Sequence, residues 1–212
     1  MNSSRLIAIG DIHGEYDKLD NLIQKIAPAK DDTIVFTGDY IDHGKNSKLV
    51  IDYLIKLSKT INCIFLKGNH ESLLITAKNN ELRDVANWYV VGGFKTLKNY
   101  GGSVDNIFRT HGEFFENLKL YHMTDKYFFV HGGINSSKSL DEQTEDDLLW
   151  IRHSFINYPH NLKQKVVFGH TPFDKPYIGK DKIGIDTGCG KYKDAKLTAF
   201  ICDDEIFIQS DN

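Results

Sequence analysis

Short apolar runs alternate with amphipathic segments along the first third of the chain. Three short runs are rich in β-branched side chains and end at a glycine, which is typical of buried parallel strands. They occupy residues 5–10, 33–38 and 61–68. The segments between them occupy residues 15–27 and 47–59. In the first of these, apolar side chains keep the i, i+3, i+4, i+7 spacing of a helix with one buried face, and they are Leu19, Leu22, Ile23 and Ile26. The pattern predicts a βαβαβ unit with a parallel sheet.

The rest of the chain changes character twice. Residues 71–120 have apolar side chains at helical spacing and few β-branched runs, which predicts a helical insert. From residue 127 the strand pattern returns in YFFVHGG, VVFGH, IGKDKIGID, AKLTAFICDD and EIFIQS. The last two runs flank residues 202–204 as the strands of an antiparallel hairpin do. We expect an α/β chain whose second half builds a further β layer, with two sheets packed face to face as a sandwich and helices outside.

Length and composition limit the classes of protein to which the chain can belong. The chain has 212 residues, 41% apolar and 26% charged, which suits one globular core, so we expect a single domain over residues 1–212. No apolar run approaches the roughly 18 residues of a membrane span, and the stretch before Asp11 is too short for a secretory signal. We therefore expect a cytoplasmic protein. Three cysteines without a CxxC pair indicate reduced thiols, and a net charge of −3 gives no electrostatic footprint for nucleic acid.

Polar residues follow the predicted strands at the point where each strand ends. The five loops read GDIHG (10–14), GDYIDHG (38–44), GNHE (68–71), HGG (131–133) and GHT (169–171). Ligands bind outside the carboxyl ends of the strands in open α/β sheets, so we expect these loops to meet at one crevice. Each motif alone also fits an ordinary turn with a structural histidine, but five such motifs in chain order indicate a functional site.

The loops supply six side chains that can coordinate a metal ion: Asp11, His13, Asp39, Asn69, His131 and His170. Oxygen and nitrogen ligands without thiolate suit manganese, iron or zinc and disfavour a cysteine-built structural zinc site. Six ligands are too many for one catalytic ion with an open position. They fit two ions that share a bridging carboxylate, for which Asp39 is the best candidate. Two adjacent ions are a known device for displacement at phosphorus.

The motifs resemble those of the phosphoprotein phosphatase (PPP) family within the calcineurin-like metallophosphoesterases, of the bacterial serine/threonine type. The resemblance extends to WYVVGGFKTLKNYGG (88–102), LLWIRHSF (148–155) and IDTGCGKYKDAKLTAF (185–200). Many metallophosphoesterases end the fifth motif in Gly-His-x-His, whereas Pro172 takes the place of the second histidine here, as in the phosphatase branch. The resemblance implies the αββα metallophosphoesterase fold and a single metallophosphoesterase catalytic domain.

The resemblance also implies how the metal ions are held. One ion would be bound by Asp11, His13 and Asp39, and the other by Asp39, Asn69, His131 and His170. Manganese is favoured for both positions, with iron and zinc left open. A hydroxide that bridges the two divalent ions would be the nucleophile, because their charge lowers the pKa of bound water.

Four further residues have roles implied by the resemblance. His70 is similar to the family's general acid, with Asp42 as the carboxylate that orients it. Arg152 is similar to a substrate-phosphate ligand, which its fork of N–H donors suits. His43 stands where the family usually has a phosphate-binding arginine. We therefore expect phosphate binding that is weaker or pH dependent, unless Arg152 or Lys45 compensates.

These features predict a dimetal-dependent phosphoester hydrolase. The leading hypothesis is a serine/threonine protein phosphatase, with dual specificity for phosphotyrosine left open, acting on a phosphoprotein, a phosphopeptide or a small phosphoester. The alternative is a dinucleoside polyphosphate (diadenosine tetraphosphate) hydrolase, a class that shares these motifs but tends to have longer chains. A regulatory module without catalysis and a nuclease rank lower, because the ligand positions are filled and the chain is slightly acidic. We expect neither a nucleic-acid partner nor a membrane.

Other conspicuous residues have structural explanations. Four histidines outside the loops are expected at the surface or between helices, and they are His111, His122, His153 and His160. We expect Trp88 and Phe94 to share a helix core, and Cys189 to fill space near the crevice. Tyr192 is near enough to this region in the sequence to reach substrate.

Overall fold

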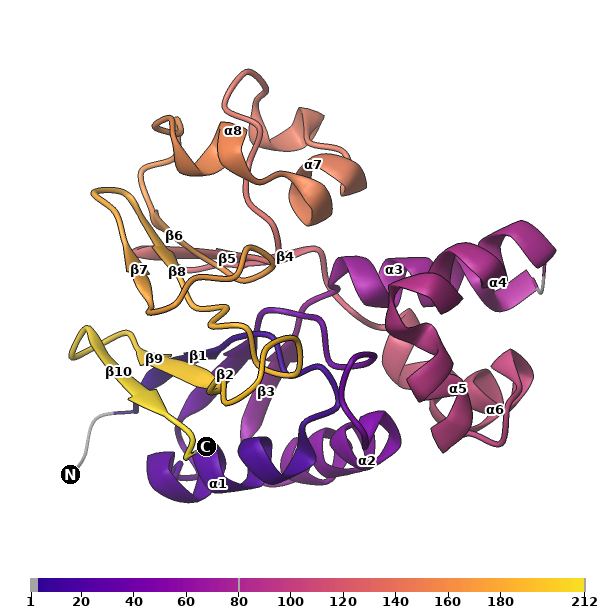
Figure 1. Cartoon of the computed structure of the whole chain (residues 1–212). Helices are drawn as coiled ribbons and strands as arrows, with labels where there is room; N and C mark the ends of the chain where they lie inside the picture. The colour runs from indigo at the N-terminus through magenta and orange to yellow at the C-terminus, as the bar shows by residue number, and fades with distance from the viewer. Residues whose placement is uncertain (1–3, 80, 212) are drawn as a thin grey trace.

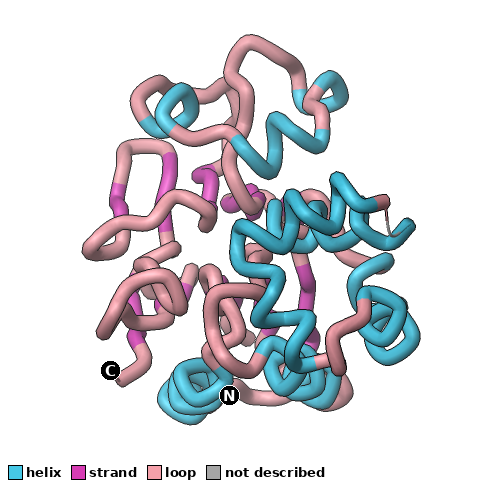
Figure 2. Tube along the Cα trace, turned by 45° about the vertical axis from the view of Figure 1, so that its right-hand side comes forward, coloured by secondary structure: helices cyan, strands magenta, loops and turns pink. Residues whose placement is uncertain are grey.

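The computed structural model describes residues 4–79 and 81–211. Two five-stranded sheets lie face to face at the centre of the molecule, and helices cover their outer sides (Figure 1). A further group of helices stands beside the sandwich at one end (Figure 2). This is the predicted α/β sandwich flanked by helices, so the fold class inferred from the sequence is confirmed.

The first sheet has the strand order β10-β9-β1-β2-β3. Its strands are β1 (Leu6–Ile9), β2 (Thr33–Phe36), β3 (Asn62–Phe65), β9 (Thr198–Ile201) and β10 (Ile206–Gln209). Strands β1, β2 and β3 pair in parallel, while β9 and β10 add an antiparallel edge beside β1. The βαβαβ unit and the C-terminal hairpin are both confirmed. The hairpin extends the first sheet, so the second half of the chain contributes to both layers.

Two helices connect the parallel strands and cover the outer face of the first sheet (Figure 1). They are α1 (Tyr16–Ile26) and α2 (Ser47–Leu57). The apolar stripe predicted for α1 is buried along its whole length, and it consists of Leu19, Leu22, Ile23 and Ile26. Each helix returns the chain to the start of the next strand, so the loops after β1, β2 and β3 open at the same edge.

The second sheet has the order β4-β5-β6-β8-β7. Its strands are β4 (Tyr121–Met123), β5 (Tyr127–Val130), β6 (Lys165–Phe168), β7 (Tyr177–Ile178) and β8 (Lys182–Gly184). Strands β5, β6 and β8 are parallel, and β4 and β7 pair antiparallel at the two edges. Helices α7 (Glu145–Trp150) and α8 (His153–Ile156) cover its outer face (Figure 1), and a 3₁₀ turn lies at Leu140–Glu142.

Apolar side chains fill the space between the two sheets. The buried residues of this layer include Ala8, Val35, Phe129, Val167 and Phe200. Fully burying an apolar side chain of this size contributes about 1.5–3 kcal/mol, so the contact holds the sheets firmly against each other. The loops after β1, β2, β3, β5 and β6 consequently meet at one edge of the sandwich.

A group of helices occupies the segment between β3 and β4. Its members are α3 (Asn69–Thr76), α4 (Leu82–Trp88), α5 (Phe94–Asn99) and α6 (Val104–Glu116), with a 3₁₀ turn at Ala77–Asn79 and a π-helical turn at Tyr89–Gly93. The helical insert around residues 71–120 is therefore confirmed. The prediction that Trp88 and Phe94 share a helix core is wrong in part, because Trp88 is buried but Phe94 is 46% exposed. Gly92, at φ 122°, breaks the helical path between them, and a separation of six positions does not bring two side chains to one helix face in any case.

Within the described ranges, no helix combines the length and the apolar character needed to cross a membrane. The three cysteines, Cys63, Cys189 and Cys202, are free thiols.

Candidate metal centre

Loops at the carboxyl ends of five strands bring their polar side chains together. They follow in chain order: Asp11 and His13 after β1; Asp39, Asp42 and His43 after β2; Asn69 and His70 after β3; His131 after β5; and His170 after β6. All of these side chains except that of His43 are buried, although every one of them is polar or ionisable. Buried charged groups are unfavourable unless they are paired or bind an ion.

A first cluster is formed by Asp11, His13 and Asp39, whose ligand atoms all lie within 4.8 Å of one another. The Nε2 atom of His13 is 3.4 Å from Asp39 Oδ2 and 4.0 Å from Asp11 Oδ2. On the other side of the ring, Nδ1 lies 2.9 Å from the carbonyl oxygen of Ile41, to which it donates. The Nε2 lone pair of His13 therefore faces the two carboxylates, as it must in a metal ligand.

A second cluster contains Asp39, His131 and His170 within the same limit of 4.8 Å. Asn69 completes it, because its Oδ1 atom lies 2.9 Å from His131 Nε2 and 2.8 Å from His170 Nδ1. His131 donates from Nδ1 to the carbonyl oxygen of Thr37 at 2.8 Å, which leaves Nε2 facing the cluster. Asp39 belongs to both clusters, and this is the position that a bridging carboxylate requires.

The donor set fits divalent cations. Across residues 4–79 and 81–211, the buried side-chain atoms without a hydrogen-bond partner include His13 Nε2, Asp39 Oδ2 and His170 Nε2. Burial lowers the pKa of His13 and lowers that of His131 to about 4, so both rings are neutral and able to ligate near pH 7. Cations would satisfy His13 Nε2 and Asp39 Oδ2 and balance the buried carboxylates, so the residues present fit a dimetal centre.

Asp186 is a buried carboxyl group beside this centre that the sequence patterns did not single out. Burial raises the pKa of Asp11 well above its usual range, and Asp186 and Asp39 raise it further. The Oδ1 atom of Asp186 accepts the N–H of Gly188 at 2.8 Å, while its buried Oδ2 atom has no hydrogen-bond partner among the described residues. Burial and neighbouring negative charge favour the protonated form of a carboxyl group, and a bound cation would reverse this preference. In the sequence, the only feature that could have pointed to Asp186 is its place in the IDTG motif.

The site loops hold several non-glycine residues in left-handed backbone conformation. These are His13 (φ 47°), Asp39 (φ 53°), Asp42 (φ 72°), His43 (φ 46°) and His170 (φ 62°). Each costs on the order of 1–3 kcal/mol and persists only where the surroundings enforce it. Here the first two loops are bonded to each other, since the N–H groups of Ile12 and His13 both donate to the carbonyl oxygen of Asp39, at 3.0 and 2.9 Å.

Glu71 fixes the loop that carries Asp39. Its carboxylate accepts the N–H groups of Asp39 and Tyr40, each at 2.9 Å, and that of Gly68 at 3.0 Å. Burial, followed by the negative charge of Asp39, raises the pKa of Glu71 to about 8. The residue had no role in the sequence analysis. Glu71 is the third residue of α3 and fits a capping-box pattern, and this pattern could have indicated in the sequence that its carboxylate binds backbone N–H groups.

His70 and Asp42 form a buried pair, with His70 Nδ1 2.8 Å from Asp42 Oδ2. The carboxylate also accepts the indole N–H of Trp88 at 2.9 Å and the hydroxyl of Thr96 at 2.7 Å. Burial raises the pKa of Asp42, and these donors oppose that shift. Trp88 and Thr96 come from the helical insert, so the insert orients a side chain at the end of a strand. Sequence reasoning had assigned Trp88 to packing alone.

A cavity of about 470 Å³ opens beside the two clusters. Its lining consists of His43, Asn69, His70, Val91, Trp150, Arg152, Pro172, Lys191 and Tyr192. Arg152 donates from its guanidinium to the carbonyl oxygen of His170 at 2.9 Å, which fixes it at the wall. Burial lowers the pKa of His43 to about 4. Lys45, considered as a substitute for the missing arginine, is not among the residues that line this cavity.

The four remaining histidines lie outside the site, and they are His111, His122, His153 and His160. His111 joins two helices of the insert through a hydrogen bond of 2.7 Å to the hydroxyl of Tyr100. His160 lies 2.9 Å from the carbonyl oxygen of Asp181 and packs against Phe155. The contacts of His111 and His160 are structural, as we expected for these two residues.

The fold and the two clusters define a metallophosphoesterase. The chain belongs to the calcineurin-like phosphoesterase family, whose sequence profile matches residues 4–205. This family uses a dimetal centre, in agreement with the donor set described above.

Curated relatives fall into two groups. The chain is 32% identical over 158 residues to the serine/threonine-protein phosphatase PP2A-like PPG1 of Saccharomyces cerevisiae, over 72% of this chain and 38% of the relative. It is 28% identical over 213 residues to the asymmetrical bis(5'-nucleosyl)-tetraphosphatase PrpE of Bacillus velezensis, over 85% of this chain and 83% of the relative. Three serine/threonine phosphatases similar to this chain are matched over only 20–47% of their own length.

A solved structure provisionally named a diadenosine tetraphosphatase superposes with a TM-score of 0.76 at 20% identity. The superposition covers 99% of this chain and 94% of that one, which shows that the two share a fold.

Proposed function

We propose that the chain is a divalent-metal-dependent phosphatase that removes phosphate from phosphoserine or phosphothreonine in a protein or peptide. The observation that carries the proposal is the buried His70–Asp42 pair beside two candidate metal clusters joined by Asp39. A proton donor beside a centre of positive charge is what displacement at phosphorus requires, and this geometry supports such roles for the pair and the clusters. Similarity to serine/threonine phosphatases over 72% of the chain supports this substrate class, and phosphotyrosine is included as a further substrate.

In this proposal the six ligands divide into two sets. Asp11, His13 and Asp39 would hold one ion, and Asp39, Asn69, His131 and His170 the other. When bound, the ions supply Lewis-acid activation of water and neutralise the negative charge of the phosphoryl group. Manganese is the metal we propose, with iron and zinc as alternatives, because these ions accept mixed carboxylate, amide and imidazole ligands.

The side chains around the cavity bind the phosphoryl group and supply a proton. Arg152 uses one N–H to fix itself on His170 and presents its remaining donors to the phosphoryl oxygens. His70 gives a proton from Nε2 to the leaving alkoxide, because its Nδ1 is engaged by Asp42. His43 lines the same cavity as an uncharged donor that contributes to orientation more than to charge.

We propose further that residues 1–212 act as one catalytic domain in the cytoplasm. The three free cysteines suit a reducing compartment. The substrate in this proposal is a phosphoprotein, a phosphopeptide or a small phosphoester. Nucleic acid is not part of it, because the chain carries a net charge of −3.

Hydrolysis of a dinucleoside tetraphosphate is the second function that the comparisons favour. The tetraphosphatase relative is matched over 83% of its own length, compared with 38% for the yeast phosphatase. This chain is therefore close in extent to a protein with that activity. The clusters and the His70–Asp42 pair would serve either substrate, since both reactions transfer a phosphoryl group to water.

The decisive experiment compares substrates on the Mn²⁺-loaded protein. Turnover of a phosphoserine peptide, p-nitrophenyl phosphate and diadenosine tetraphosphate is measured on the same preparation, with bound metal determined by elemental analysis. The proposal expects a higher kcat/KM for the phosphopeptide than for the dinucleotide. The reverse order supports the second function, and the absence of turnover with Mn²⁺, Fe²⁺ or Zn²⁺ contradicts both.

A further inference from the structure

The loop between β8 and β9, residues 185–197, is locked against the first metal cluster. Gly190, at φ 75°, packs so closely that a Cβ atom there would lie 2.6 Å from the Cβ of His13. The next residue, Lys191, donates its backbone N–H to the carbonyl oxygen of Gly188 at 3.0 Å, which closes a tight turn. Lys191 therefore starts from a backbone position that is set by a candidate metal ligand.

The side chain of Lys191 is distinguished from that of the buried Lys182 by its lack of a polar partner among the described residues. Lys191 lines this cavity together with Arg152, His43 and His70. Over residues 4–79 and 81–211, no hydrogen bond or ion pair engages its side chain. The buried Lys182 is different, because it donates to two backbone carbonyl oxygens, at 2.7 and 2.6 Å, and its role is structural.

The charge environment keeps Lys191 positive. Burial lowers its pKa, but the carboxylates of Asp39, Asp11 and Asp186 outweigh this effect and raise the pKa above its ordinary value. Two of these three carboxylates belong to the candidate metal clusters. Divalent ions bound there would neutralise them, and an anion in the cavity would then be the favourable counter-charge for the ammonium group.

We propose that Lys191 is a substrate-binding residue that holds an oxygen of the substrate phosphoryl group together with Arg152. The inference rests on the proposed phosphatase function and adds a binding residue to it. Lys191 supplies a positive charge that the imidazole of His43 lacks, and it does so from the loop after β8, whereas His43 lies after β2. A lysine acts as a point charge toward phosphate, so it needs proximity rather than the planar geometry of a guanidinium.

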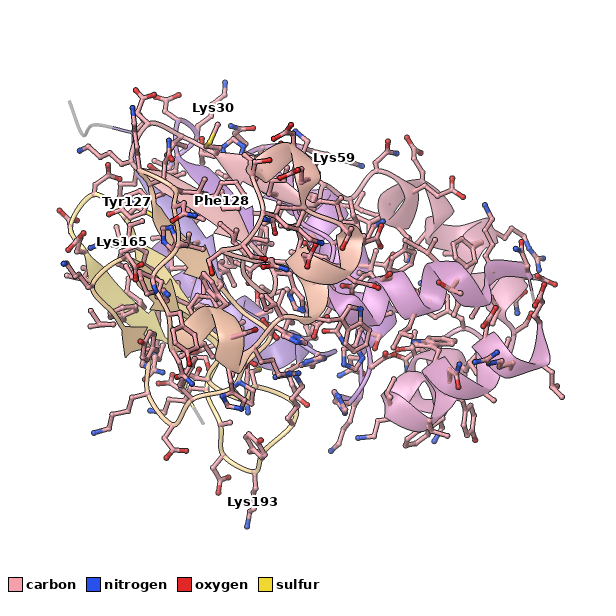
Figure 3. All side chains as sticks on the ribbon, turned by 90° about the horizontal axis from the view of Figure 1, so that it is seen from above. Lys30, Lys59, Tyr127, Phe128, Lys165 and Lys193 are labelled. Atoms are coloured by element: carbon pink, nitrogen blue, oxygen red, sulfur yellow. The ribbon has the colours of Figure 1, made fainter. Side chains whose placement is uncertain are left out.

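Phosphate binding tests this assignment without requiring turnover. Inorganic phosphate is titrated calorimetrically into the Mn²⁺-loaded parent and into Lys191→Met, Lys191→Arg and Lys193→Met. Lys193 is the matched control, because it lies in the same loop and points away from the molecule (Figure 3). We expect the Kd for phosphate to rise about tenfold or more in Lys191→Met, as for a lost hydrogen bond to a charged group, and to recover largely in Lys191→Arg. Lys193→Met should match the parent.

Kinetics and metal affinity distinguish a phosphate-binding role of Lys191 from a role in balancing the charge of the carboxylates. With p-nitrophenyl phosphate, Lys191→Met should raise KM by a factor similar to the change in Kd, with bound Mn²⁺ unchanged. An unchanged Kd combined with tighter Mn²⁺ binding overturns the inference and makes Lys191 a balancing charge for the metal-free carboxylates. If the parent binds phosphate but turns over no phosphoester, the proposed function fails, while the change in Kd still decides the role of Lys191.

Discussion

The imidazole of His70 is held between two carboxylates. Its Nδ1 atom lies 2.8 Å from Asp42 Oδ2, and its Nε2 atom lies 3.8 Å from Oδ2 of Asp39, the residue common to both metal clusters. Burial lowers the pKa of His70, but Asp39 and Asp42 outweigh burial and raise it above its ordinary value. The charged form of the ring is therefore favoured more than in a free histidine, with Nδ1 anchored on Asp42 and Nε2 facing Asp39.

Replacing either member of this pair should impair hydrolysis of substrates with poor leaving groups. We expect His70→Asn and Asp42→Asn to lower kcat for a phosphoserine peptide by about 10²–10⁴-fold, the contribution of a general acid. The loss on p-nitrophenyl phosphate should be much smaller, because nitrophenolate leaves without a proton. Parent activity on the peptide should fall as the pH rises through the raised pKa of His70, and this limb should vanish in His70→Asn.

His122→Asn is a suitable control for these variants, since this histidine lies on β4 and stacks on Phe129. Steady-state kinetics over pH 5–9 on both substrates would check the prediction. Equal losses on the two substrates would show that His70 does not donate the proton.

Trp88→Phe should weaken the same step from a distance. The variant keeps an aromatic ring in the buried position but removes the N–H that donates to Asp42. Asp42 would then be less stable as a carboxylate and would hold His70 less firmly. We expect kcat on the phosphoserine peptide to fall about tenfold, in line with the loss of one hydrogen bond to a charged group. Bound metal and activity on p-nitrophenyl phosphate should change little; a matching loss there would assign Trp88 to packing.

The strand-end motifs could be predicted from the sequence because their geometry is local. Each of Asp11, Asp39 and His131 comes directly after an apolar run, and parallel strands present their carboxyl ends at one edge. The spacing of Leu19 and Leu22 likewise reports one helix face. In such cases a few neighbouring residues determine where the side chain points.

The residues that sequence reasoning missed act over long separations. Trp88 reaches Asp42 across 46 positions, and nothing local in the insert shows that its indole has a polar partner. Lys191 depends on Gly190 fitting against His13, which only the packed structure reveals. Phe94 was misplaced because a π-helical turn interrupts the helix between it and Trp88.

His43→Arg should improve substrate binding. Burial lowers the pKa of His43 to about 4, with the positive charges of His70 and Lys191 acting in the same direction, so the ring is uncharged at pH 6–8. We therefore expect the missing arginine to weaken phosphate binding without making it pH dependent in this range. We expect an arginine here to lower KM for a phosphomonoester about fivefold, as a charged donor replaces a neutral one. His43→Gln should leave KM near the parent value, and an unchanged or higher KM in His43→Arg would contradict the idea.

Glu71→Gln should change how the stability of the metal-free protein depends on pH. The folded pKa of Glu71 is about 8, above its ordinary value of 4.5, so the folded state binds this proton more tightly than the unfolded state does. The stabilisation is fully present below about pH 4.5 and is lost as the pH rises through about 8. His131 acts in the opposite direction below pH 6.5, because its folded pKa is lowered to about 4 and folding is therefore stabilised as the pH rises towards 6.5. The informative window for Glu71 is therefore pH 6.5–8.

In that window the free energy of unfolding of the parent should fall with pH, by up to about 1.4 kcal/mol per unit from Glu71 alone. Glutamine cannot ionise, so the free energy of unfolding of Glu71→Gln should depend less steeply on pH. The variant also loses stability at every pH, because an amide accepts the N–H groups of Asp39, Tyr40 and Gly68 less well, but this loss does not change the slope. Urea unfolding in the presence of a chelator at pH 6.5, 7.2 and 8 gives both slopes. Parallel slopes for parent and variant would mean that Glu71 is already ionised at pH 6.5, with its three N–H donors outweighing the effect of burial.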